Sequence, residues 1–330
     1  MKWNANNIAR SAGLALSLCL PLGSASAKEW KSYTYIDAVT TPAYKGLQKL
    51  AADFEQATGG EIVIKPAVGG SLPIKANNIT QAVADGVLPI ADDMAFAGNI
   101  RIGGLIRLPF LIETEAEYAK AREVWMKAVD AELDKMGVKL LAEYHYPAQV
   151  LFTSVPVTKL DEVKGKKIRV SSAEQGELVK RLGGVPVTLA PPEVATALQS
   201  GVINGVLTAS AGGGRVWREF FTHNYRLPVN WANSMFIVNK DVWEGLSPDH
   251  QSKLQKAAQD AAAQVEAELR DTEQSSTDQF RSTGMVVTVP TPEEVKTAVD
   301  QSRDYWDDWA KQKGPAAVEA LKSVRAALGR

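Results

Sequence analysis

The sequence predicts an α/β fold with two lobes, mixed sheets and one long helix that spans both lobes. Short apolar runs alternate with amphipathic helical segments along most of the chain, which is the pattern of βαβ units. Near the C-terminal end, one helical pattern runs for about 30 residues and would be roughly 45 Å long, which suits a helix that bridges two lobes. With 330 residues, the chain is long enough for two domains.

The first 27 residues are expected to lie outside the fold. Two basic residues, Lys2 and Arg10, precede a short apolar run that is followed by Ala25-Ser26-Ala27. This order is typical of a secretory signal peptide, and the run is too short to span a bilayer. The only cysteine, Cys19, lies within the run. Cleavage after Ala27 would leave a mature chain without cysteine, which suits a bacterial periplasmic protein.

The first lobe is predicted to begin with three strands and two helices. The first strand covers 33–36. The helix after it starts at Pro42 with Thr41 as N-cap, and Gly59-Gly60 ends it. The elements that follow are a strand at 61–65, a helix at 73–85 and a strand at 93–99.

The middle of the chain repeats this alternation. Two helices, at 174–182 and 191–200, are each followed by glycine, a common C-terminal signal. Strands are predicted at 137–144, 150–154, 166–170, 185–189, 202–207 and 234–240.

The C-terminal part is predicted to be helical. The long helix is capped by Ser247 and runs to about Phe280. Another helix starts after Thr291, and Gly314 breaks it before a short last helix. We assign residues 28–147 plus about 234–262 to lobe I, and residues 148–233 plus about 263–330 to lobe II.

Composition and motifs exclude several classes of function. The chain is 45% hydrophobic and 23% charged with a net charge of -1, so it lacks the basic field of a nucleic-acid binder. Asp92-Asp93 is interpreted as a solvated strand entrance rather than a metal site, and no metal or cofactor motif is present. Gly212-Gly213-Gly214 is interpreted as a plain flexible turn.

The one arrangement that suggests catalysis is a serine motif. Ser210 stands in a sequence like a nucleophile elbow, but Thr208 replaces the first glycine. A periplasmic serine hydrolase would need one of the histidines within about 3 Å of Ser210. The three histidines, His145, His223 and His250, are far apart in the sequence.

Arg169 raises a question that the sequence alone leaves open. It stands between Ile168 and Val170 in the predicted strand 166–170. Arginine is almost never buried without a partner, so its side chain either points to water or faces an anion from outside the chain. An exported, two-lobed chain without a catalytic signature has the profile of a periplasmic binding protein, whose lobes close over a ligand. In such a cleft, a guanidinium would bind a carboxylate.

Four segments resemble those of one transporter family. They are FEQATGGEIVIKPAVGGSL, LDEVKGKKIRV, LGGVPVTLAPPEVATALQSGVINGV and IVNKDVWEGLSPDHQ. With these segments, the chain resembles the substrate-binding subunits of tripartite ATP-independent periplasmic (TRAP) transporters, the dicarboxylate-receptor family. The match follows the family's order over nearly the whole mature chain.

The resemblance implies a role without enzymatic activity. Such a protein would capture an organic acid in the periplasm and deliver it to the membrane permease subunits of a TRAP transporter. Arg169 would form the salt bridge with the ligand carboxylate. A receptor of another transporter type remains an alternative, as does the serine hydrolase.

The resemblance also suggests further ligand-binding residues. Gln149 stands where many members carry a second arginine, which favours a monocarboxylate, including bulky, aromatic or keto acids. Pro191 replaces a phenylalanine that often packs on the ligand, which would widen the pocket. The other candidate ligand-binding residues are Thr208, Trp231, Asn233 and Asn99, with Tyr146 and Phe96 as possible wall residues.

Overall fold

A computed structural model describes residue 1 and residues 27–330 of the chain. The body of the predicted signal peptide, with Cys19, lies outside these residues. Within the described part, no helix combines the length and the apolar character needed to cross a membrane.

The fold is α/β. The strands are β1 (Lys28–Thr34), β2 (Ile62–Ala67), β3 (Ile90–Asp93), β4 (Val138–Thr153), β5 (Lys167–Val170), β6 (Val185–Thr188), β7 (Gly205–Thr208), β8 (His223–Asn239) and β9 (Val286–Thr288). The helices are α1 (Pro42–Ala57), α2 (Ile79–Ala84), α3 (Glu115–Lys135), α4 (Ala173–Arg181), α5 (Pro191–Gln199), α6 (Lys240–Glu244), α7 (Pro248–Ser282), α8 (Pro292–Asp300), α9 (Arg303–Lys313) and α10 (Pro315–Leu328).

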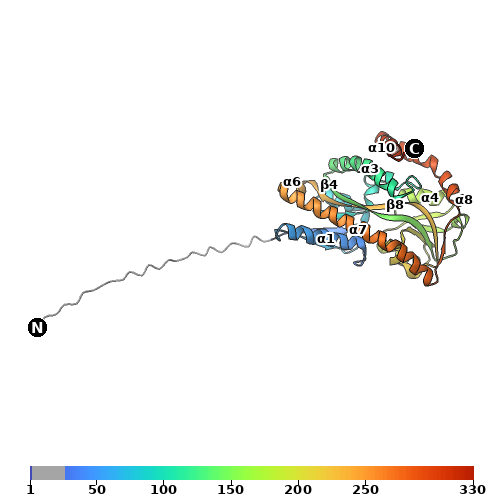
Figure 1. Ribbon diagram of the computed structural model, residues 1–330, viewed down its shortest axis with the longest axis horizontal. Coiled ribbons are helices and arrows are strands. Elements are labelled where there is room, and N and C mark those ends of the chain that lie inside the picture. Colours follow the sequence, from blue (N-terminus) through green and yellow to red (C-terminus); the bar gives the residue numbers. More distant parts are fainter. Residues whose placement is uncertain (2–26) are drawn as a thin grey trace.

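Two long antiparallel strands, β4 and β8, form the centre of a mixed sheet (Figure 1). The strand order is β2-β1-β3-β8-β4-β7-β5-β6, and β9 pairs with β8. The C-terminal half of β8 pairs with β3, whereas the C-terminal half of β4 pairs with β7. Each long strand therefore belongs to both halves of the molecule.

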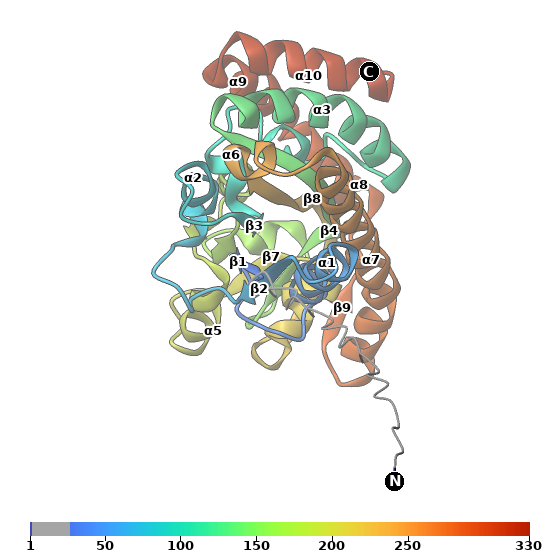
Figure 2. The same cartoon turned by 90° about the vertical axis from the view of Figure 1, so that its left-hand side faces the viewer.

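Helices cover both faces of this sheet. On one face, α1 lies beside α7, and their apolar residues share a core with the strands (Figures 1 and 2). On the other face, α3 and α10 pack together over a second core. At 35 residues, α7 is roughly 52 Å long and crosses both halves, as the sequence predicts.

The predicted lobe boundaries after residues 147 and 233 fall within β4 and β8. The chain therefore passes between the halves through continuous strands. The C-terminal helices contact both halves. Helix α10, which lies in the range assigned to lobe II, packs against α3 in lobe I, while Arg181 of α4 binds Asp304 of α9 at 2.8 Å.

The predicted helix starts are confirmed. The hydroxyls of Thr41, Ser247 and Thr291 each accept a hydrogen bond from a backbone N–H in the first turn of the helix that follows. Each of these helices also begins with proline, which has no N–H to leave unpaired.

Of two predictions near residue 90, the helix is confirmed only in part and the strand is wrong. The predicted helix at 73–85 is only α2, preceded by a 3₁₀ turn at Ala76–Asn78. The predicted strand at 93–99 is another 3₁₀ turn, because β3 ends at Asp93, whose Oδ1 accepts a hydrogen bond from Ala95 N at 2.7 Å. Asn99 bonds the carbonyl of Asn77 and joins the two turns.

Other predictions were incomplete. The strands predicted at 137–144 and 150–154 form the single strand β4, which carries a register shift between Tyr146 and Gln149. The strand predicted at 234–240 is the end of the much longer β8. Helix α3 was not predicted, although its buried residues Tyr118, Ala121, Trp125, Val129 and Leu133 have helical spacing.

His145 of β4 links the two helices that flank its strand. Its Nε2 lies 2.8 Å from Glu115 of α3, and its Nδ1 lies 3.0 Å from Glu266 of α7. Burial opposes its charge, but the hydrogen bonds to Glu115 and Glu266 outweigh burial and raise the pKa of His145 to about 9.

This shift predicts a pH-dependent contribution to stability. The contribution of His145 is complete below its ordinary pKa of 6.5 and is lost as the pH rises through about 9. We expect His145→Gln to lower the free energy of unfolding by roughly 2 kcal/mol at pH 6. The gap to the wild type should shrink at pH 10. Urea unfolding at both pH values checks this.

The matched control for this experiment is His223→Gln, because among the described residues the His223 ring bonds only the neighbouring hydroxyl of Thr222. If His145→Gln lowers the free energy of unfolding by the same amount at pH 6 and pH 10, the stabilising role of the charged His145 is contradicted.

Candidate functional site

A small cavity of about 60 Å³ lies where the two halves of the molecule meet. We call it the Arg169 cavity. It adjoins a larger outer cleft of about 640 Å³, and both spaces are lined by Tyr35, Met94, Arg169, Ser171 and Pro191. The other residues lining the Arg169 cavity are Ile36, Asp37, Ala38, Thr41, Pro42, Tyr146, Gln149, Thr208, Ala211, Gly212, Gly213, Val216 and Trp217.

Arg169 is buried, with 5% of its surface exposed. Strand β5 pairs with β6 and β7 on its two sides, which fixes the backbone of Arg169 between Val187 and Val206. Its Nε donates a hydrogen bond to the carbonyl of Leu189 at 3.0 Å, and its Cζ lies 5.6 Å from the centre of the Trp217 ring. One edge of the guanidinium is therefore held by the protein.

The charge of Arg169 has no counter-charge in the described chain. No carboxylate there forms an ion pair with it, and Nη1 and Nη2 have no hydrogen-bond partner among the described residues. Burial lowers its pKa to about 10, and the more distant Glu193 opposes this shift only in part. Burying an unpaired ion costs on the order of several kcal/mol. The site therefore suits an anion that enters the cavity.

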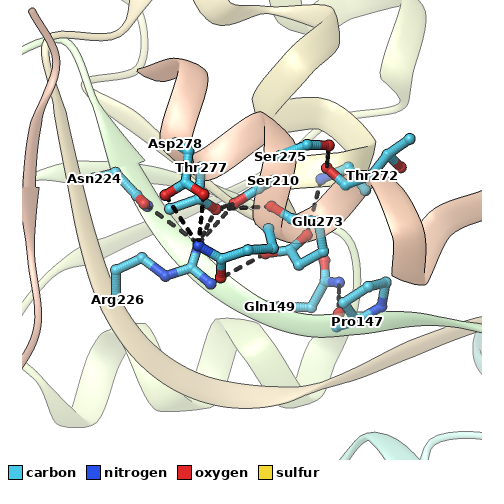
Figure 3. Close-up of polar contacts among 12 residues, drawn as sticks. Pro147, Gln149, Ser210, Asn224, Arg226, Thr272, Glu273, Ser275, Thr277 and Asp278 are labelled. Atoms are coloured by element: carbon cyan, nitrogen blue, oxygen red, sulfur yellow. Dashed lines mark hydrogen bonds and ion pairs between the residues drawn. The ribbon is translucent and has the colours of Figure 1, made fainter. Parts of the chain in front are cut away.

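Two more predicted residues lie in the same cavity. Gln149, in the irregular part of β4, is 3% exposed, and its Nε2 donates to Pro147 O at 2.9 Å (Figure 3). Thr208, at the end of β7, is 7% exposed, and its Oγ1 accepts a hydrogen bond from Gly213 N at 3.0 Å. The second amide hydrogen of Gln149 and the hydroxyl hydrogen of Thr208 have no protein acceptor among the described residues, so both can serve a ligand.

The glycine loop after β7 forms a wall of the cavity, which the interpretation as a plain turn missed. A Cβ on Gly213 would lie 2.3 Å from Cζ3 of Trp217 and 2.7 Å from Oγ1 of Thr208. Only glycine lets the loop approach so closely. Trp217 was also missed, and the three consecutive glycines were the available signal for this close packing.

Two tyrosine hydroxyls next to a buried acid form another part of the cavity wall, and the Tyr146 ring lies against the glycine loop at Gly212. The hydroxyls of Tyr35 and Tyr146 form a hydrogen bond with an oxygen–oxygen distance of 2.7 Å. Beneath them, Asp92 is fully buried rather than solvated, as is Asp93. Burial raises the pKa of Asp92 to about 7, against hydrogen bonds from Ser234, Thr34 and Tyr144 that favour its charge. The described residues contain no His, Cys, Asp or Glu cluster suited to a metal ion.

The remaining candidates lie away from the cavity. Trp231 donates its Nε1 hydrogen to Ile112 O at 2.9 Å and packs on Tyr118 in the core. Asn233 is fully buried, and its Oδ1 accepts from Arg107 Nε at 2.8 Å. Both side chains belong to β8 but leave the strand away from the cavity. Asn99 is exposed and holds the turn at Asn77, and Phe96 is fully buried beneath Arg107.

Ser210 has no catalytic geometry. Its Oγ accepts a hydrogen bond from Arg226 at 2.6 Å and lies 2.9 Å from Thr277 Oγ1 (Figure 3). Arg226 also pairs with Glu273 of α7, which accepts from the backbone N–H of Ala211. This cluster ties the glycine loop to α7. None of the chain's histidines, all of which are described, forms a hydrogen bond with Ser210, so the serine hydrolase hypothesis finds no support.

Comparison with known proteins identifies the family. The family model described as bacterial extracellular solute-binding protein, family 7 (DctP) matches residues 33–313, which is most of the chain. The chain belongs to this family. It is a TRAP-type periplasmic solute receptor, and the family consists of binding proteins rather than enzymes.

Three relatives illustrate the match. The C4-dicarboxylate-binding periplasmic protein DctP of Rhodobacter capsulatus is 22% identical and covers 94% of this chain and 96% of its own. The structure of Bordetella pertussis DctP7, a receptor that binds pyroglutamic acid, has a TM-score of 0.84 at 24% identity and covers 91% of this chain and all of its own. A marine metagenome TRAP solute-binding protein specific for pyroglutamate has a TM-score of 0.84 at 25% identity, covering 91% and 99%.

The close packing of the glycine loop in this receptor gives a testable prediction. Gly213→Ala forces Trp217 or Thr208 to move, so we expect it to lower the free energy of unfolding by roughly 1–3 kcal/mol. Gly98→Ala is the matched control, because nothing lies within 4 Å of its added Cβ. Urea titration measures both variants. Equal effects would show that the loop does not pack tightly on the cavity wall.

Proposed function

We propose that this receptor captures an organic monocarboxylate through a salt bridge between Arg169 and the ligand carboxylate. The observation that carries the proposal is the buried guanidinium, which faces the cavity without a counter-charge from the described chain. A carboxylate would accept parallel hydrogen bonds from Nη1 and Nη2 and would remove the cost of the unpaired charge. Gln149 and Thr208 supply neutral donors beside it.

The charges around the cavity favour one carboxylate over two. Arg169 is the single cation among the described residues that line the cavity, and Asp37 is the acid at its margin. A second carboxylate would have to be desolvated with no cation to receive it, which is costly. The cavity is also small, which supports a compact acid over a bulky one.

The family and the connections between the halves support a closing motion followed by delivery to a permease. The ligand enters through the outer cleft, and the halves close by bending at the irregular stretch of β4 and β8 and along α7. The membrane permease subunits of a TRAP transporter then recognise the closed form. Relatives of this chain bind a C4-dicarboxylate or pyroglutamate, so organic acids are the expected ligand class.

Removal of the guanidinium should strongly weaken ligand binding without harming the fold. After unfolding and refolding to remove co-purified ligand, the wild type should gain about 2.7 kcal/mol of stability at a hundredfold excess of a bound acid over its Kd. We expect Arg169→Ala to lose affinity roughly 30-fold or more. Without ligand, this variant should be as stable as the wild type or more stable, because a buried unpaired charge is gone.

Thermal unfolding against a panel of monocarboxylates and dicarboxylates provides the measurement. The control is Arg101→Ala, which removes an exposed arginine that lines neither space. If a ligand raises the melting temperature of Arg169→Ala as much as that of the wild type, the salt bridge is disproved. If dicarboxylates stabilise the wild type more than monocarboxylates do, the monocarboxylate assignment is disproved.

A further inference from the structure

Two tyrosine hydroxyls meet in the wall of the Arg169 cavity. Tyr35 directly follows β1, and Tyr146 lies in β4 just before its register shift. Their oxygens are 2.7 Å apart, and both side chains line the cavity together with Arg169. Arg169 belongs to the range assigned to lobe II, whereas both tyrosines belong to lobe I. A ligand that touches both ends would therefore hold the lobes together.

The protein does not use all the hydrogen-bond donors and acceptors of these two hydroxyls. Two phenols bring two O–H donors, and the bond between them uses one. The hydroxyl of Tyr144 is the other polar group near both phenols, but it donates to Asp92, and no carbonyl or carboxylate of the described residues accepts a hydrogen bond from Tyr35 or Tyr146. Burial raises the pKa of both phenols, so both are neutral. One O–H donor and several lone pairs are thus available at the lobe I end of the cavity.

The charge beneath the pair is negative. Asp92 of β3 accepts hydrogen bonds from Thr34 at 2.8 Å, from Ser234 at 2.6 Å and from Tyr144 at 2.9 Å. These donors come from β1, β8 and β4. Each of these strands therefore places a neutral hydroxyl against Asp92, and none of them places a cation there.

A buried cation in the same part of the core is already engaged. Arg107 bonds Asn233 Oδ1 and Met94 O, both at 2.8 Å, and it does not line the cavity. The positive charge of Arg107 and the negative charge of Asp93 each favour the ionised form of the other residue. Asp92 is therefore left as the uncompensated acid below the tyrosines, where a second negative charge on a ligand would be repelled.

We propose that Tyr35 and Tyr146 form a specificity subsite for a neutral polar group on the ligand. The subsite donates to a carbonyl oxygen and accepts from an N–H or O–H, so the ligand is a compact carboxylate with an amide, lactam, carbonyl or hydroxyl group at its far end. Asp92 disfavours a carboxylate at that position. This inference rests on the proposed function, because it places the ligand's own carboxylate on Arg169.

Isothermal titration calorimetry at pH 8 with ligand-free protein tests the subsite. The probes are pyroglutamate, glutaramate and glutarate; the last two differ only by an amide in place of a carboxylate. The variants are Tyr35→Phe, Tyr146→Phe and Asp92→Asn. Tyr305→Phe is the control, since Tyr305 is buried but lines neither space. Arg169→Ala is measured alongside.

We expect the wild type to bind pyroglutamate or glutaramate at least tenfold more tightly than glutarate. Each Tyr→Phe change should weaken the neutral-ended probes roughly three- to tenfold, as for loss of one neutral hydrogen bond, and leave glutarate less affected. Asp92→Asn should reduce the difference in affinity between glutaramate and glutarate. Tyr305→Phe should bind as the wild type does.

The results separate the two proposals. If Arg169→Ala loses binding while both Tyr→Phe variants bind every probe as the wild type does, the subsite is disproved and the proposed function stands. If Arg169→Ala binds normally, the proposed function fails. Equal or tighter binding of glutarate by the wild type, or no binding of any probe at 1 mM, would also overturn the subsite. An unchanged gap in Asp92→Asn would overturn the role of Asp92.

Discussion

The buried charge of Arg169 is the constraint on which the site depends. The fold holds one edge of its guanidinium with the carbonyl of Leu189 and covers it with the Trp217 ring, but offers it no carboxylate among the described residues. Such an arrangement is costly while the cavity contains only water and becomes favourable when an anion enters. The cavity around Arg169 suits an anion in three ways. It offers further hydrogen-bond donors, the glycine loop packs closely against it, and its volume is small.

The long strands β4 and β8 explain how a site with such precise contacts can also open. They carry the chain through both halves, and their register is irregular between Tyr146 and Gln149, next to the cavity. Arg169 lies in the range assigned to lobe II, the tyrosine pair lies in the range assigned to lobe I, and all three residues line the same cavity. A ligand that satisfies both ends would therefore favour closed lobes through its own contacts, which is the differential binding that any ligand-driven conformational change requires.

Much of the fold could be predicted from local chemistry. The caps at Thr41 and Ser247 and the length of α7 follow from hydrogen-bonding and periodicity rules that act within a few residues. Arg169 stood out because a charge between two buried aliphatic residues needs an explanation. The rest depended on tertiary contacts: β4 continues through Pro147 only because β8 pairs along it, and adjacency along β8 could not show that Asn233 turns toward Arg107. Tyr35 lacked any sequence signal.

A crystal structure of the receptor with its acid bound would test the central claim most directly. The account predicts one carboxylate of the ligand within about 2.7–2.9 Å of Nη1 and Nη2 of Arg169, with the Nε bond to Leu189 retained. A ligand bound without contact to Arg169, or a guanidinium that turns away to pair with a carboxylate of the protein, would contradict it.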